Sequence, residues 1–217
     1  LYPGFMYLAE IPKVLGFSFV NSIKIIFGFS MMASAVFTYL WLAKIFDKLS
    51  ASLSGLFYLY APYHLFDLYK RGSVGEVLAL AVIPFIFWQI ERRSFFGLTL
   101  GIGLLILSHN TLALLFLPII VIYFLIRQTK SIIYNLLSII LGLGISAFFW
   151  LPAIFDLQYT RFFQTQVSNW QDYFVNVDLI GWGSLIVLTL VILIRFLKRR
   201  EASFYSNDTY HYSGLFL

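Results

Sequence analysis

A short stretch near the middle of the first half of the sequence concentrates side chains that could carry chemistry. Arg71 has a planar fork of N–H donors that matches phosphate oxygens bidentately, so we consider it a candidate to hold a phosphate or pyrophosphate. Asp67 or Glu76 would then bind a divalent metal ion, as a candidate cofactor, or a sugar hydroxyl. The substrate-binding candidates in this stretch are therefore His64, Asp67, Lys70, Arg71 and Glu76.

The same residues also fit a structural role. Asp67 and Arg71 are four residues apart and would form an ion pair on a short helix. Glu76 would open the next helix, where the helix dipole favours a carboxylate. The sequence alone leaves both interpretations open.

Further polar candidates interrupt or follow later apolar runs, and these are His109, Asn110, Asp156 and Arg161. His109 either carries a proton or hydrogen-bonds a carbonyl within a helical hairpin. Asn110 either contacts a ligand or caps a helix. Asp156 and Arg161 either bind substrate or form a surface ion pair that adds little stability.

The composition restricts the class of protein. Of the 217 residues, 60% are hydrophobic and 12% are charged, whereas a soluble domain has roughly 25% charged residues. We therefore expect membrane lipid as the main surrounding of the chain, in the cell membrane. The net charge of +5 does not indicate nucleic acid, because the basic residues punctuate apolar runs instead of forming a patch. The sequence contains no cysteine, which excludes disulfides and sulfur-ligated metal sites.

Charged residues also divide the sequence into helices. About 20 apolar residues cross a bilayer core of about 30 Å. The charge-free run 94–126 is too long for one crossing, so we place a hairpin at Ser108–Thr111. We expect Asn21 to cap the first span and Pro152 to kink or end the sixth. The pattern predicts an all-α, polytopic transmembrane bundle of about seven spans, near residues 22–46, 49–62, 77–90, 94–108, 111–127, 131–155 and 179–197, with outer loops at 63–76 and 156–178.

The basic residues predict the orientation, because Lys and Arg are in excess in cytoplasmic loops. If the first span runs from outside to inside, every basic cluster except Lys70–Arg71 lies inside. The site candidates then share the non-cytoplasmic face, opposite a face of unpaired basic residues. Because the chain begins at Leu1 and ends in the start of an apolar segment, we expect a single transmembrane domain truncated at both ends.

The run from Tyr58 to Tyr69, followed by Arg71-Gly72-Ser73 and Glu76, resembles a family of prokaryotic membrane proteins described as 6-pyruvoyl-tetrahydropterin synthase-related. Leu107–Asn110 and Ala147–Ala153 match it as well, and the resemblance extends from Tyr2 to about Arg161. The family looks like a branch of the GT-C glycosyltransferase architecture.

A GT-C resemblance implies transfer of a sugar from a polyprenyl-phosphate donor at the non-cytoplasmic face, with an acidic residue in the first outer loop. That loop lies upstream of a Tyr-Pro segment such as Tyr2-Pro3, so we expect the main catalytic acid upstream of Leu1. Asp67, Arg71, Glu76 and His109 would then contact the donor or the acceptor.

Two other functions fit the sequence, a membrane transporter or lipid flippase and a non-catalytic scaffold subunit. A transporter would carry ionisable residues near mid-membrane, and a scaffold would tolerate mutation of the whole polar cluster. We do not expect a pterin synthase, because such an enzyme needs a cluster of histidines on zinc and this chain has three His.

Overall fold

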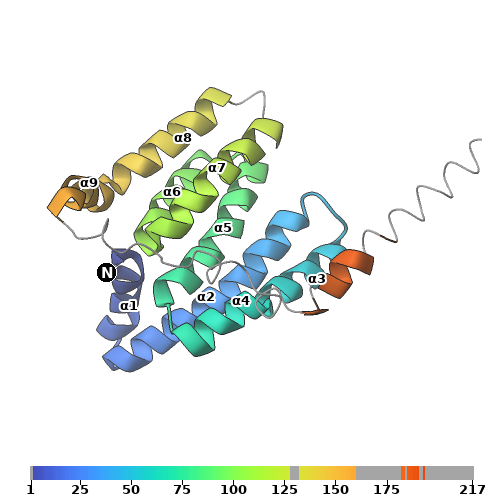
Figure 1. The fold of residues 1–217 in the computed structure, drawn as a ribbon, viewed down its shortest axis with the longest axis horizontal. Helices are drawn as coiled ribbons and strands as arrows, with labels where there is room; N and C mark the ends of the chain where they lie inside the picture. The colour runs from blue at the N-terminus through green and yellow to red at the C-terminus, as the bar shows by residue number, and fades with distance from the viewer. Residues whose placement is uncertain (1, 128–131, 160–181, 184, 191–192, 194–217) are drawn as a thin grey trace, which may run out of the picture. The chain divides into compact units, whose positions relative to one another are not determined.

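The computed structural model describes residues 2–127, 132–159, 182–183, 185–190 and 193. Contacts divide the chain into two compact units, residues 1–172 and 173–217. Every regular element in the described residues is a helix, which confirms the predicted all-α class (Figure 1). The predicted span 179–197 and the predicted loop 156–178 fall mostly outside the described residues.

The first unit begins with a helix that the sequence did not predict, α1 (Pro3–Val14), which starts with proline at its first position. Proline suits this position because its missing N–H would be unpaired there anyway. The following elements are α2 (Phe19–Leu42), α3 (Lys48–Leu59), α4 (Pro62–Phe66), the π-helical turn η1 (Asp67–Arg71), α5 (Val74–Arg92), α6 (Phe95–Ser108), α7 (Asn110–Arg127), α8 (Ile132–Ile145), α9 (Ala147–Asp156) and the 3₁₀ turn η3 (Leu157–Tyr159).

Short polar side chains start several of these helices. Ser18, Asp47 and Ser94 each accept a hydrogen bond from the backbone N–H three residues later, at the starts of α2, α3 and α6. The prediction that Asn21 caps the first span was wrong, because Asn21 is the residue whose N–H is capped by Ser18. The predicted hairpin between α6 and α7 is confirmed, with His109 in extended conformation between them.

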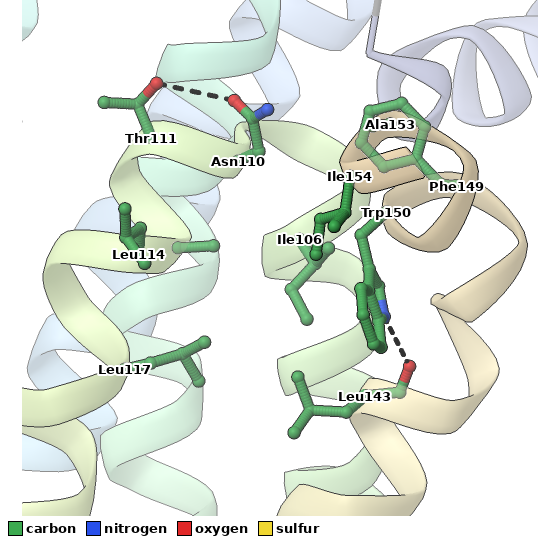
Figure 2. A pocket seen from close by; sticks show the side chains of 11 residues that line it. Ile106, Asn110, Thr111, Leu114, Leu117, Leu143, Phe149, Trp150, Ala153 and Ile154 are labelled. Atoms are coloured by element: carbon green, nitrogen blue, oxygen red, sulfur yellow. Dashed lines mark hydrogen bonds between the residues drawn. The ribbon is translucent and has the colours of Figure 1, made fainter. Parts of the chain in front are cut away.

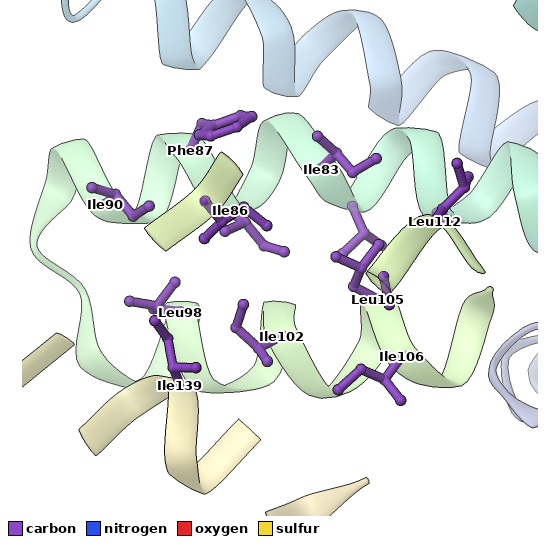
Figure 3. Packing of buried hydrophobic residues seen from close by; sticks show 14 of the residues in the cluster. Ile83, Ile86, Phe87, Ile90, Leu98, Ile102, Leu105, Ile106, Leu112 and Ile139 are labelled. Atoms are coloured by element: carbon purple, nitrogen blue, oxygen red, sulfur yellow. The ribbon is translucent and has the colours of Figure 1, made fainter. Parts of the chain in front are cut away.

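Helix α5 lies at the centre of the packing, and most of its residues are buried. Its side chains are apolar around nearly the whole circumference, as expected of a helix with neighbours on all sides. Figure 3 shows Ile83 and Ile86 of α5 among Leu98 and Ile102 of α6, with Ile139 of α8 beside them. Because α5 carries both the site residue Glu76 and the core, it anchors the site to the most buried part of this unit.

Small residues allow the helices to approach closely, as is typical of helices packed in a membrane. A Cβ added to Gly55 of α3 would lie 2.8 Å from the carbonyl oxygen of Ala35 in α2. A Cβ on Gly142 of α8 would lie 2.8 Å from the carbonyl oxygen of Thr99 in α6. Backbone therefore meets backbone at both crossings.

The predicted span 131–155 is bent earlier than expected. Helices α8 and α9 meet at an angle of 66° at Ser146, whereas Pro152 lies inside α9. The hydroxyl of Ser146 donates to the carbonyls of Gly142 and Leu143, a contact with the preceding turn that often bends helices. The prediction that Pro152 breaks the span was therefore wrong.

Three helices in the described residues, α2, α5 and α7, are long and apolar enough to cross a membrane, and the bent pair α8–α9 makes up to four. Helices α3 and α6, with 12 and 14 residues, are shorter than a full crossing. The structure thus supports a membrane protein with several apolar helices and does not confirm seven spans.

Candidate functional site

The segment predicted as the outer loop 63–76 is largely helical. Pro62 starts α4, and η1 continues it with the wider π-type turn, a geometry that occurs often at functional sites. The helix ends at Gly72, whose φ of 60° is the left-handed conformation that glycine adopts easily. Ser73 then donates its N–H to the Asp67 carbonyl, and α5 begins at Val74. This sharp reversal brings Glu76 back beside Asp67 and Arg71.

The Arg71 guanidinium contacts three acceptor side chains, all through its Nη1. Its Nη1 lies 3.2 Å from Asp67 Oδ1, 2.9 Å from Glu76 Oε2 and 3.4 Å from the Tyr63 hydroxyl. The hydroxyl of Tyr63 in turn donates to Glu76 Oε1. We call these four residues, Tyr63, Asp67, Arg71 and Glu76, the Arg71 cluster.

The two carboxylates are buried while the guanidinium is not. The side chains of Asp67 and Glu76 are 0% and 4% exposed, whereas that of Arg71 is 45% exposed. Among the described residues Arg71 donates through Nη1 alone, so Nε and Nη2 remain available. The outer edge of the fork is therefore open to a ligand.

Burial leaves some acceptors of the cluster incompletely satisfied. Asp67 Oδ2 is buried and has no hydrogen-bond donor among the described residues, whereas Glu76 Oε2, also buried, is 2.9 Å from Arg71 Nη1 in the ion pair. Burial, together with the negative charge of Glu76, raises the pKa of Asp67 to about 6 even though Arg71 opposes the shift. Burial and the hydrogen bond to Glu76 also raise the pKa of Tyr63, so this residue remains a hydroxyl donor at neutral pH.

His64 is buried and makes its hydrogen bond outside the Arg71 cluster. It is 2% exposed, and its Nδ1 lies 2.8 Å from the carbonyl oxygen of Tyr58, while Nε2 has no partner in the described part. Burial lowers the pKa of His64, so a neutral imidazole that donates from Nδ1 fits this geometry. This hydrogen bond from His64 connects α4 to the end of α3.

The turn between α6 and α7 lies next to the cluster. Gly75, the residue before Glu76, packs on the Ser108 carbonyl so closely that an added Cβ would lie 2.5 Å from its oxygen. Tyr2 packs against His109 with the two rings tilted and their centroids 4.6 Å apart, and it donates its hydroxyl to Asn110 Oδ1 at 2.9 Å. Burial lowers the pKa of His109, and Arg71 adds to the shift while Glu76 opposes it. His109 and Asn110 therefore lie near the Arg71 cluster, with Tyr2 and Gly75 between them and Glu76.

The remaining predicted site residues are not brought into the cluster. Lys70 is exposed and has no ion pair with the described residues, and Asp156 ends α9 at an exposed position. Arg161 lies outside the described residues, and with it the predicted pair with Asp156. The described residues contain no group of three acidic or histidine side chains that could hold a metal ion. A metal on Asp67 and Glu76 would thus need further ligands.

Sequence reasoning missed two tyrosines of this region, Tyr63 and Tyr2, as parts of the site. Tyr63 is four residues before Asp67, which is a detectable helical spacing. The contact of Tyr2 with Asn110 spans 108 residues, and no local pattern could reveal it.

A second polar network lies at the other end of α5. Glu91 accepts from Arg127 Nε at 2.7 Å and Nη2 at 3.0 Å, and from the Tyr123 hydroxyl at 2.5 Å. Tyr123 also accepts from the Trp41 indole at 2.8 Å, which links α2, α5 and α7. We call these residues the Glu91 network. We predicted that the inner face carries mainly unpaired basic residues, and Arg127 is an exception because it pairs with Glu91.

The apolar helices, their close backbone contacts and polar groups at the helix ends define an all-helical membrane protein. The chain belongs to the family of the 6-pyruvoyl-tetrahydropterin synthase related domain, a membrane protein family, which matches residues 2–213. No curated protein and no solved structure matches the chain.

Proposed function

We propose that this protein transfers a sugar from a polyprenyl-phosphate donor to an acceptor at the non-cytoplasmic face of the membrane. The observation that carries the proposal is the geometry of Arg71. Two buried carboxylates fix one of its nitrogens and leave the rest of the fork exposed at the end of α5. A preoriented guanidinium of this kind suits bidentate binding of a phosphate.

The chemistry is a displacement at the anomeric carbon of the sugar. The acceptor oxygen forms a new bond to this carbon, the bond from the carbon to the phosphate oxygen breaks, and the polyprenyl phosphate leaves with the bonding electrons. A carboxylate base takes the proton of the acceptor hydroxyl. Arg71 stabilises the charge on the departing phosphate, because donors aimed at developing charge lower the barrier.

Asp67 and Glu76 have a different role in this scheme. They orient Arg71, because Asp67 Oδ1 and Glu76 Oε2 both contact its Nη1.

The test uses the full-length protein, purified and supplied with a series of polyprenyl-phosphate-linked sugars. We expect Arg71→Gln to lower kcat/KM roughly 10- to 100-fold, the range for losing a hydrogen bond to a charged group. Arg71→Lys restores the charge but not the fork, so it should recover only part of the activity. The matched control is Arg93→Gln, an exposed arginine at the opposite end of α5.

Unchanged turnover in Arg71→Gln would remove Arg71 from the reaction. Turnover that is absent with every lipid-linked sugar would contradict the transferase proposal itself.

A further inference from the structure

An open groove lies along the side of the first unit, between α7 and the bent pair α8–α9. Its volume is about 510 Å³, within the range of small-molecule sites. Figure 2 shows Leu117 of α7 and Trp150 of α9 pointing into it from opposite sides, with Ile106 of α6 between them. Leu114, Leu143 and Ile154 complete the apolar walls. We call this feature the lateral groove.

The walls of the lateral groove are held in place by the backbone. The Trp150 indole donates to the Leu143 carbonyl at 2.9 Å, across the bend at Ser146 (Figure 2). This hydrogen bond holds the half-buried ring in one orientation at the groove wall. The 66° bend between α8 and α9 thus keeps α9 apart from α7 and leaves the space between them open.

Polarity in the groove is confined to one end. Only Asn110 and Thr111 contribute polar side chains to the lining, and both lie at the start of α7. Asn110 accepts the Tyr2 hydroxyl, and Tyr2 in turn packs beside Gly75, the residue before Glu76. The polar end of the groove therefore adjoins the Arg71 cluster.

This arrangement selects the kind of molecule that fits. An apolar groove between membrane helices offers almost no hydrogen-bond partners, so it favours a molecule that is apolar along its length. The cationic groups of Arg71 and Lys70 lie in the segment that leads into the same end of α5, which favours an anionic headgroup there. A lipid with a hydrocarbon chain and a phosphate meets both conditions.

We propose that the lateral groove binds the hydrocarbon chain of the lipid phosphate donor, which enters from the bilayer between α7 and α9 and places its phosphate at Arg71. This inference rests on the proposed function for the identity of the lipid. It adds where the chain lies and which residues determine its fit, namely Leu114, Leu117 and Trp150.

The experiment measures binding of undecaprenyl monophosphate to the purified full-length protein in detergent. Leu114 lines the groove, whereas its neighbour Leu115 does not, although both are exposed leucines of α7. We expect Leu114→Trp to fill the groove and weaken binding roughly 10-fold, the scale for excluding a leucine-sized apolar contact. Leu115→Trp should bind within about 2-fold of the unchanged protein. Equal affinities of the two variants would overturn the proposal.

A second variant keeps the test decisive if Leu114→Trp fails to fold. Ala153→Phe narrows the groove from α9, and Leu151→Phe on the same helix, outside the lining, is its control. A roughly 10-fold loss of affinity in Ala153→Phe but not in Leu151→Phe would support the proposal. Equal affinities of Ala153→Phe and Leu151→Phe would contradict it.

Undecaprenol, which lacks the phosphate, separates the groove from the proposed function. Competition by undecaprenol that Leu114→Trp abolishes would support chain binding even in a protein without transferase activity. A different outcome is binding that depends on the phosphate, is weakened by Arg71→Gln and is unchanged by Leu114→Trp. That result would support the phosphate site at Arg71 and contradict the proposal that the lateral groove binds the hydrocarbon chain.

Discussion

Arg71 gains its orientation from residues that are far more buried than it is. Asp67 and Glu76 contact its Nη1 from two elements, η1 and α5, so the guanidinium cannot swing without breaking an ion pair. A buried carboxylate that loses its partner is costly, which makes the arrangement stiff. The open edge of the fork is thereby presented in one direction, which is a requirement for bidentate binding.

Tyr63 is the neutral member of the Arg71 cluster, and its removal tests how much the cluster depends on it. Tyr63→Phe leaves Glu76 Oε1 with Arg71 but without the tyrosine donor. We expect the free energy of unfolding to fall by roughly 1–2 kcal/mol, the cost of a buried acceptor that loses one donor. Thermal unfolding in detergent measures it, with Tyr69→Phe as the control because Tyr69 is 79% exposed. Equal effects would show that the Tyr63 hydroxyl adds nothing to stability.

Asp67 predicts a pH dependence of stability with a definite sign. Its pKa of about 6 in the folded protein lies above the ordinary 3.8, so the folded state holds a proton that the unfolded state has released. Its stabilising contribution is therefore complete below pH 3.8 and is lost as the pH rises through about 6. Asp67→Asn should remove this part of the slope between about pH 4 and 6, where the protonation of Asp67 differs between the folded and unfolded states.

Two histidines near the cluster also make stability depend on pH, so the comparison must be between variants. His64 and His109 have lowered pKa values and contribute the opposite slope, because the folded state binds fewer protons than the unfolded state below pH 6.5. Asp47→Asn is the contrasting variant, since hydrogen bonds from Ser50 lower the Asp47 pKa and its contribution is lost as the pH falls. Slopes of the same sign for Asp67 and Asp47 would contradict this prediction.

The sequence predicted the members of this site better than their arrangement. The spacing of Asp67 and Arg71 gave their ion pair directly, because residues four apart meet on any helix. The return of Glu76 to the same guanidinium depends on the reversal at Gly72 and on the π-type turn, which no hydrophobic pattern encodes. The contact of Tyr2 with Asn110 depends on how α1 packs and could not be predicted locally.

At the scale of the elements, the close contact between α5 and the turn from α6 to α7 sets the distance from the Arg71 cluster to His109. Gly75 makes this contact, and Gly75→Ala would push a methyl group against the Ser108 carbonyl. We expect a loss of roughly 1–3 kcal/mol in the free energy of unfolding, as for other overpacked sites. Gly28→Ala is the matched control, because nothing lies within 4 Å of its Cβ position. That change should be neutral or stabilise α2 by up to about 1 kcal/mol.

The Glu91 network joins three helices at the other end of α5. Glu91→Gln replaces the bidentate ion pair with Arg127 by neutral contacts, and we expect it to cost about 1–3 kcal/mol of stability. Glu10→Gln changes an exposed pair with Lys13 on α1 and should cost roughly 0–1 kcal/mol. Denaturant unfolding of both variants tests the difference. A Glu91 variant as stable as the Glu10 variant would show that the helices hold together without the network.

The sequence predicted helices well where charges or polar turns interrupt apolar runs. Ser94 and the Ser108–Thr111 cluster gave the ends of α6 and α7 nearly to the residue. Helix α1 was missed because Pro12 and the charges of Glu10 and Lys13 obscured a short apolar pattern. The bend at Ser146 was missed because its cause is a hydroxyl bonded to the preceding turn, whereas proline is the more familiar signal.

At the scale of the whole molecule, helix α5 separates two polar groups of the first unit, one at each of its ends. Its 19 residues span about 28 Å, close to the thickness of a bilayer core. The Arg71 cluster lies at its first turn and the Glu91 network at its last. If α5 crosses the membrane, the two groups face different aqueous compartments.

Single cysteines can test this separation directly, because the chain contains none. Lys70→Cys and Arg93→Cys place exposed thiols just beyond the two ends of α5. The excess of basic residues around Arg93 predicts that its end is cytoplasmic. We therefore expect a membrane-impermeant maleimide added outside intact cells to label Lys70→Cys and to reach Arg93→Cys only after permeabilisation. Labelling in the reverse order would invert the orientation and move the Arg71 cluster to the cytoplasmic face, where the proposed donor would have to be presented from the inner leaflet.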